Sequence, residues 1–172
     1  MLVRCAPIRR QVPRVPYWWR GHPVFLSYRR AGCSFASGWL RDRLVAKLGP
    51  YRVIRDVDCI PAGISFLDFI DGVIPDCRAV LALIDPEWTV SAAANEWRYA
   101  ATPGDMVAFE LASAFAAGVD VIPVLVRGAS MPQPNALPEA LRRLSQLQSI
   151  ELRPDHNFYA DVDRLVVALK QR

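Results

Sequence analysis

The chain has 172 residues, of which 52% are apolar, and its formal net charge at pH 7 is +4. This length and composition fit one domain with a full hydrophobic core. The absence of a run of 18 apolar residues and of a secretory signal excludes a membrane span and predicts a soluble, cytoplasmic protein. The four cysteines and two histidines lack the spacing of zinc ligands, so we expect no metal.

The positive charge belongs to the start of the chain, where residues 1–20 hold five arginines and no acidic residue. Removing these five from the 21 basic residues leaves 16 against 17 acidic residues, a net charge of −1. We therefore divide the chain into a Pro- and Arg-rich extension at 1–22 and a domain at 23–172, and we expect no nucleic-acid binding by the domain. The extension either binds an acidic partner, packs Tyr17, Trp18 and Trp19 on the domain, or remains a leader that does not pack.

From residue 23 onward, strand patterns alternate with helical patterns. Strands are predicted at 23–28, 51–55, 79–84, 120–126 and 149–152. Helices are predicted at 34–48, 66–73, 139–144 and 158–170, with a further helix between Asp105 and Gly118. Loops follow the strands at 29–32, 56–63 and 86–104, and loops as long as the third are often functional. This alternation predicts an α/β fold with a parallel five-stranded sheet and helices on both faces.

The helix between Asp105 and Gly118 holds a single charged residue, Glu110. Its neighbours three and four positions away are apolar or small, and none can pair with a carboxylate. A mostly buried helix keeps a carboxylate for a reason. One alternative is that Glu110 points into water on an exposed stripe. The other is a site, because Glu110 lies near the carboxyl edge of the sheet, where ligands of parallel sheets bind.

Three sequence segments together resemble a known family. They are Phe25-Leu-Ser-Tyr-Arg-Arg30, then Asp56-Val-Asp-Cys-Ile-Pro-Ala-Gly63, then Glu110 followed eleven residues later by Val121-Ile-Pro-Val-Leu125. In this order and spacing they resemble a bacterial TIR (Toll/interleukin-1 receptor) domain over residues 23–170. The resemblance implies a flavodoxin-like three-layer sandwich with strand order 2-1-3-4-5. It also implies that the loop at 56–63 mediates self-association, through Ile60, Pro61 and Gly63.

The resemblance allows two functions. Some TIR domains are non-catalytic modules that only recruit other TIR domains, and others cleave NAD+ at the nicotinamide–ribose bond. The enzymes carry a glutamate at the position of Glu110, so we expect an NAD+ nucleosidase without a cofactor, acting in bacterial antiphage defence or signalling. A carboxylate suits an oxocarbenium-like ribose, because it stabilises positive charge without a metal. Glu96 is a rival catalytic residue in the loop at 86–104. The product and a separate activator or effector protein cannot be read from the sequence.

Substrate-binding positions also follow from the resemblance: Tyr28, Arg29, Arg30, Asp56, Asp58, Phe66, Trp88 and Met106. In similar enzymes the residues after the first strand contact the dinucleotide, so Arg29 or Arg30 is expected either to bind phosphate in a forked geometry or to be a solvated loop residue. The two aspartates either bind ribose hydroxyls or cap their loop. Phe66 or Trp88 either stacks on a base or belongs to the core. Met106 departs from the family, because many enzymatic relatives place an aromatic residue, commonly Trp, at this position; Trp88 or Trp97 is the alternative aromatic partner.

Self-association is expected for a second reason. A single domain of this type offers an open edge, so we expect Glu110 of one subunit to face water, where its charge contributes little. A neighbouring subunit across that edge would exclude the water. Ile60 is expected to protrude from a turn that Pro61 and Gly63 fix. The alternative is that Ile60 folds back into its own core.

Overall fold

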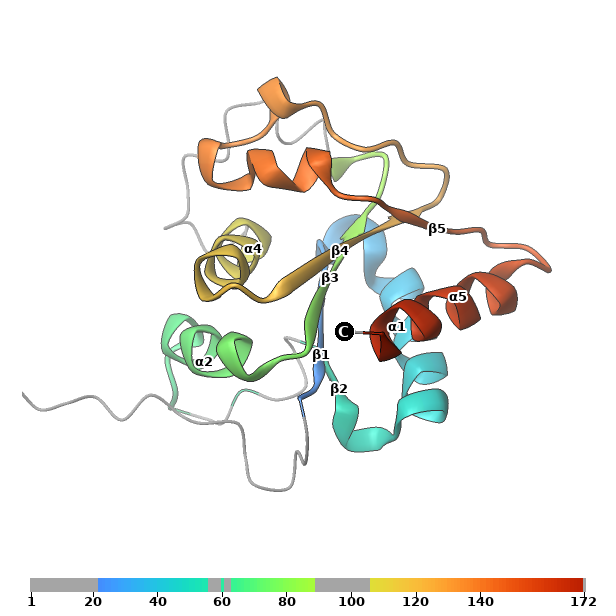
Figure 1. The fold of residues 1–172 in the computed structure, drawn as a ribbon, viewed down its shortest axis with the longest axis horizontal. Coiled ribbons are helices and arrows are strands. Elements are labelled where there is room, and N and C mark those ends of the chain that lie inside the picture. Colours follow the sequence, from blue (N-terminus) through green and yellow to red (C-terminus); the bar gives the residue numbers. More distant parts are fainter. Residues whose placement is uncertain (1–21, 56–59, 61–62, 89–105, 172) are drawn as a thin grey trace, which may run out of the picture.

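The computed structural model describes residues 22–55, 60, 63–88 and 106–171, and Figure 1 shows its fold. Five parallel strands form one sheet: β1 (Val24–Ser27), β2 (Val53–Arg55), β3 (Ala79–Ile84), β4 (Asp120–Val126) and β5 (Ile150–Leu152). Their order is β2-β1-β3-β4-β5, which confirms the predicted order. In the register of the sheet, Val24 pairs with Val53 on one side and with Ala79 on the other.

Helices cover both faces of the sheet (Figure 1). The helices α1 (Arg30–Leu48) and α5 (Phe158–Lys170) lie on one face. The helices α2 (Phe66–Val73) and α4 (Met106–Ala117) and the 3-10 helix η6 (Glu139–Gln146) lie on the other. Short 3-10 helices occur at η1 (Pro50–Arg52), η3 (Ile74–Asp76) and η5 (Pro134–Ala136). This arrangement confirms the predicted three-layer sandwich.

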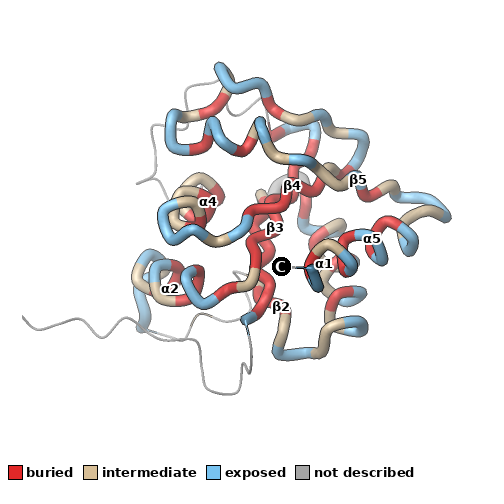
Figure 2. The backbone as a smooth tube through the Cα atoms, in the orientation of Figure 1, coloured by how far each residue is buried: buried red, intermediate tan, exposed pale blue. Residues whose placement is uncertain are grey.

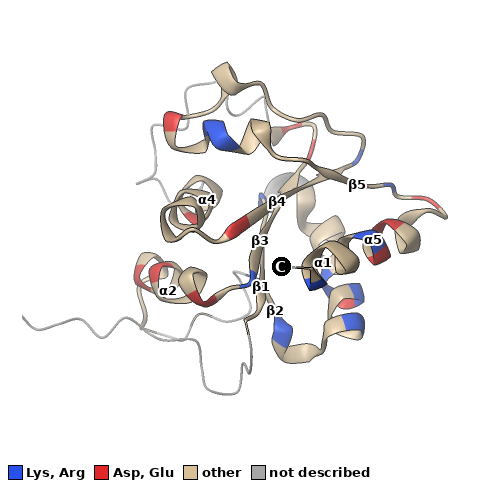
Figure 3. Cartoon of the chain, viewed as in Figure 1, with Lys and Arg blue, Asp and Glu red and all other residues tan. Residues whose placement is uncertain are grey.

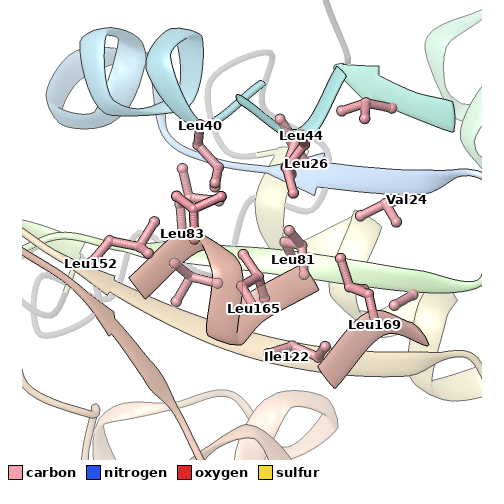
Figure 4. Packing of buried hydrophobic residues seen from close by; sticks show 14 of the residues in the cluster. Val24, Leu26, Leu40, Leu44, Leu81, Leu83, Ile122, Leu152, Leu165 and Leu169 are labelled. Carbon is pink, nitrogen blue, oxygen red and sulfur yellow. The ribbon is translucent and has the colours of Figure 1, made fainter. Parts of the chain in front are cut away.

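The central strand β3 divides the hydrophobic core into two halves. All six of its residues are buried, and successive side chains point to opposite faces. Ala79, Leu81 and Leu83 pack toward α1 and α5, the half that Figure 4 shows. Val80, Ala82 and Ile84 pack toward α2 and α4. A strand buried on both faces explains the continuous apolar run in the sequence, and Figure 2 shows buried residues all along the sheet.

The first helix begins earlier than the sequence predicts. The N–H of Cys33 donates to the carbonyl of Arg29 at 3.0 Å, so Arg30 is already helical. The predicted loop at 29–32 is therefore wrong, and Arg29 is the residue that caps α1. Gly32 suggested a turn, but Cys33 is fully buried against the sheet, and tertiary packing of this kind overrides a weak local propensity.

Two other elements differ from prediction because of proline. Pro50 starts the 3-10 helix η1, which shortens the predicted strand at 51–55 to β2. The predicted helix at 139–144 is a 3-10 helix, in which the N–H of Leu141 donates to the carbonyl of Pro138 at 2.9 Å. The end of α4 is confirmed, because Gly118 follows it with a φ of +71°, a conformation that favours glycine. No helix in the described part of the chain is long and apolar enough to cross a membrane.

Candidate functional site

The carboxyl ends of β1, β3 and β4 lie at one edge of the sheet, because these strands are parallel neighbours. Tyr28 and Arg29 follow β1, Asp85 follows β3 and Arg127 follows β4. The helix α4 begins at the same edge after the connection from β3. Ligands of parallel α/β sheets bind outside this edge, so it is the candidate site.

Arg29 and Trp88 connect the segments that follow β1 and β3. The Nη1 of Arg29 donates to the carbonyl oxygen of Trp88 at 3.4 Å. The guanidinium carbon lies 5.5 Å from the centroid of the Trp88 ring, within the range of a cation–π contact. The N–H of Trp88 donates to the carbonyl of Asp85 at 3.1 Å, which fixes the turn after β3. The structure therefore brings two predicted binding residues into direct contact.

The aromatic residues of the site belong mainly to the core. Trp88 is fully buried in the half of the core that α2 and α4 cover, and Tyr28 is also buried. Phe66 is half-buried and packs against the same half. The burial of Trp88 favours its core role, and its stacking on a base stays a prediction. The alternative core role of Trp88 and Phe66 is the one that the structure supports.

Glu110 is the carboxylate in the second turn of α4, and only 2% of its surface is exposed. It shares the buried side of α4 with Val107, Leu111 and Ala114. The helix packs against β1, β3 and β4, with α2 and η6 along its flanks (Figure 1). Because α4 is enclosed in this way, the prediction that Glu110 faces water in a single subunit is wrong. Figure 3 shows how little charge α4 carries.

Met106 is the first residue of α4 and is half-buried. It lies four residues before Glu110, and side chains at this spacing share one face of a helix. The resemblance implies an aromatic residue at this position in many enzymatic relatives, and the role of Met106 stays a prediction.

Part of the predicted self-association loop is described. Ile60 is half-buried and packs against the core, so the expectation that it protrudes is wrong and the alternative that it folds back is supported. Gly63 is exposed with a φ of +82°, a backbone that side chains rarely adopt. The exposed apolar residues beside it are Ile64 and Leu67, at 38% and 41%.

Other predicted residues lie outside the described part of the chain: Asp56, Asp58, Pro61, Glu96 and Trp97. Arg30 begins α1, but its side chain is also outside the description. Their roles stay predictions.

A charged group that was not predicted from the sequence lies at the same edge. Asp85 is buried, and the Nη1 of Arg127 lies 3.8 Å from its Oδ2 and 3.8 Å from an oxygen of Glu87. Burial, and then the neighbouring Asp85 carboxylate, raises the pKa of Cys33 to about 12. A thiol with this pKa stays protonated and is no nucleophile at neutral pH. The signal that could have found Asp85 is an acidic residue directly after a buried strand.

Metal binding finds no support among the described residues, where no group of three or more His, Cys, Asp or Glu side chains could hold a metal ion.

Comparison with known proteins identifies the family. Residues 24–166 match the family model for the TIR domain. Among solved structures, the TIR domains of the activated Roq1 resistosome, which recognises the pathogen effector XopQ, superpose with a TM-score of 0.64 at 14% identity, covering 87% of this chain and 99% of that one. A TIR-STING receptor from C. gigas in complex with 2',3'-cGAMP gives a TM-score of 0.52 at 20% identity.

The second match covers 85% of this chain and 38% of the receptor. A search of curated protein sequences found no match. At these identities the two structures show a shared fold only. The family assignment rests on the match to residues 24–166, which include all five strands of the sheet and most of the helices on both of its faces. The chain therefore belongs to the TIR domain family.

Proposed function

We propose that this TIR domain cleaves NAD+ at the nicotinamide–ribose bond, with Glu110 as the catalytic carboxylate. The observation that carries the proposal is the buried position of Glu110 in an otherwise uncharged helix that begins at the carboxyl edge of the sheet. The family includes enzymes of this kind as well as non-catalytic members. Arg29 at the same edge supplies a guanidinium for the phosphates of the dinucleotide.

The proposed reaction needs charge stabilisation more than proton transfer. The bond between ribose C1′ and the nicotinamide nitrogen breaks, and its electron pair neutralises the pyridinium ring as nicotinamide leaves. The ribose becomes oxocarbenium-like, and a carboxylate beside C1′ stabilises that positive charge. Water that adds at C1′ and loses a proton gives ADP-ribose, and a nucleophile within the substrate gives a cyclic isomer instead.

Access to Glu110 requires a change at this edge, because the side chain is enclosed in the single chain. In our proposal, self-association between TIR domains exposes Glu110 to the substrate. This reverses the expected order, in which assembly excludes water from an open carboxylate. The activated resistosome that contains the Roq1 TIR domains supports assembly as the active state. Ile64 and Leu67, which are exposed and apolar beside the loop at 56–63, are the contact residues we propose.

The second candidate function is a TIR interaction module without catalysis. One observation favours it: Met106 stands where an aromatic residue is common in enzymatic relatives. The assembly surface would then be the whole function of the domain.

Nicotinamide release from concentrated protein separates the two functions. We expect release by the natural sequence and a decrease of about 10²–10³-fold in Glu110→Gln, because the substitution keeps the size of the side chain and removes its charge. Glu139→Gln, at an exposed residue of η6, is the matched control and should release nicotinamide at the normal rate. Normal turnover in Glu110→Gln would remove Glu110 from the reaction. No release by the natural sequence would favour the interaction module.

A further inference from the structure

Four aromatic side chains form a continuous row on the face of the domain opposite to α4. Phe35 and Trp39 belong to α1, and Phe158 and Tyr159 belong to α5. Their ring centroids follow one another at 5.6, 6.3 and 5.9 Å. Phe35 is 75% exposed, and Trp39 and Tyr159 are each 56% exposed. Aromatic side chains gathered at this exposure are characteristic of surfaces that bind a partner.

A pocket with a volume of about 410 Å³ opens within this row. It is lined by Trp39, Asp42, Arg43, Pro154, Asp155, Phe158 and Tyr159. The Arg43 guanidinium already contacts Tyr159. Its Nη2 donates to the Tyr159 hydroxyl at 2.7 Å, and its central carbon lies 4.3 Å from the Tyr159 ring centroid. The remaining charged groups of the lining are the carboxylates of Asp42 and Asp155.

Both carboxylates lie at the solvent side of the pocket. The Asp42 side chain is 75% exposed, with the Nη1 of Arg41 3.6 Å from one of its oxygens. Asp155 accepts a hydrogen bond from the N–H of Asn157 at 2.7 Å. That bond lowers the pKa of Asp155, so the carboxylate is ionised at neutral pH.

Aromatic faces beside ionised carboxylates suit a guanidinium group. Its flat face stacks on a ring, while its edge donates charge-assisted hydrogen bonds to carboxylate oxygens. The contact between Arg43 and Tyr159 shows this stacking within the same pocket. The chemistry of the lining therefore calls for an arginine side chain from outside the described domain.

The chain itself carries arginines at the right distance. Its first 20 residues hold five arginines and no acidic residue. This segment leads into the domain at His22. His22 lines a small hollow together with Leu48 and Leu169, which lie in the last turns of α1 and α5. From Leu169 back to Phe158 is eleven residues of α5, about 16 Å at the rise of an α-helix. Arg14 precedes His22 by eight residues, which span up to about 26 Å when extended.

We propose that the basic segment before His22 lies along the face formed by α1 and α5 and places an arginine in this pocket. The charge of the segment is complementary to Asp42 and Asp155, and its origin at the ends of the same two helices keeps the path short. The docked segment covers the exposed rings of Trp39 and Tyr159. It also leaves the opposite side of the domain, where α2 and α4 lie, open for other contacts.

Limited trypsin digestion of the full chain tests the proposal, because each arginine of the segment is a cleavage site. Docking predicts that cleavage after Arg9, Arg10 and Arg14 is about tenfold slower in the natural sequence than in Asp155→Lys or Asp42→Lys, since cleavage follows the undocked fraction. Glu139→Lys makes the same charge change on η6, on the other face of the sheet, and should keep the natural rate. Equal rates in the natural sequence, Asp42→Lys and Asp155→Lys would overturn the proposal.

Two further measurements assign the effect to this contact. The melting temperature of Asp155→Lys should stay near that of the natural sequence. If loss of the hydrogen bond from Asn157 lowers it, Asp42→Lys still tests the contact, because the Asp42 carboxylate is exposed and its replacement should not destabilise the domain. Protection should not change on hundredfold dilution, as expected for a contact within one chain. Protection that disappears on dilution would place the arginine of a second copy in the pocket and contradict docking within the chain.

Discussion

A carboxylate removed from water interacts with a nearby cation more strongly than one in water, because the effective permittivity around it is lower. Glu110 is only 2% exposed, on the buried side of α4. A positively charged nicotinamide ring or an oxocarbenium-like ribose is the kind of partner that such a group stabilises. The same burial makes access to Glu110 the step on which activity depends.

Met106 offers a test of the proposed position of the nicotinamide ring beside Glu110. If Met106 faces the nicotinamide ring, Met106→Trp should tighten NAD+ binding by about 2- to 30-fold, because an aromatic face attracts a cation by about 0.5–2 kcal/mol. The affinity can be measured by titration with NAD+ in the Glu110→Gln background, where turnover does not interfere. Val167→Trp places the same ring at an exposed position of α5 and is the control. Weaker binding with an unchanged melting temperature would show that another side chain already fills this place.

For single residues, the sequence predicts the position of a residue within a helix or strand better than the burial of its side chain. It places Glu110 correctly in the second turn of a helix at the carboxyl edge, because the helical period and the alternation of strands and helices follow from local patterns. It does not predict that Glu110 is buried in a single chain, because the burial of α4 also depends on α2 and η6, which flank it and lie far from it in the sequence. For Trp88 it leaves the core role and the binding role open.

At the element scale, a buried carboxylate holds the start of α5 against the end of β5. Asp161 is fully buried and accepts hydrogen bonds from the backbone and guanidinium of Arg153 at 2.6–3.1 Å. Arg164 donates a further bond at 2.6 Å. The hydrogen bonds from the Arg153 side chain hold the pKa of Asp161 well below its usual range. This network fixes the connection that forms one wall of the pocket between α1 and α5.

Replacing Asp161 should therefore destabilise the domain. We expect Asp161→Asn to lower the free energy of unfolding by about 1.5–3 kcal/mol, the value of hydrogen bonds to a charged group. Because the folded pKa is lowered, the stabilisation is complete above the unfolded pKa of about 3.9 and is lost as the pH falls through the folded value. Urea titrations at neutral and acidic pH should show a difference between the two proteins that shrinks in acid. Asp163→Asn, at an exposed residue that pairs with Lys47, is the control and should change little.

Ile60 and Leu67 differ in environment, because Ile60 packs against the core and Leu67 is exposed on α2. Ile60 packs against the core, so Ile60→Asp should lower the free energy of unfolding by about 1–3 kcal/mol, the cost of placing a charge among apolar groups.

Leu67 is exposed on α2, so Leu67→Asp should change the free energy of unfolding by less than about 0.5 kcal/mol and weaken self-association. Unfolding curves and sedimentation together separate the two effects. Normal association of Leu67→Asp would exclude this surface.

The elements themselves follow closely from the sequence where the apolar pattern is long. The run at 79–84 and the helical pattern at 158–170 match β3 and α5, because both are set by periodic burial. The start of α1 does not match, because Cys33 packs into the core and draws the preceding glycine into the helix. Strand order comes from the family resemblance, since local patterns do not determine which parallel strands are neighbours.

On the scale of the whole molecule, the two faces of the sandwich have separate roles in this account. The face of α2 and α4 encloses Glu110 and carries the exposed Leu67, and the face of α1 and α5 carries the aromatic pocket for the basic segment. Glu110 is buried in a single chain, and in our proposal assembly at the first face makes it available. Activity should then depend on how many chains are assembled, whatever the affinity of each for NAD+.

The rate of nicotinamide release per molecule, measured over a dilution series at saturating NAD+, shows whether assembly activates the domain. We expect the rate per molecule to rise with protein concentration in the natural sequence and to reach a plateau when assembly is complete. We also expect a shift of that rise to higher concentration in Leu67→Asp, and about 10²–10³-fold lower rates in Glu110→Gln throughout. A rate per molecule that is constant on dilution and the same in Leu67→Asp would contradict activation by assembly.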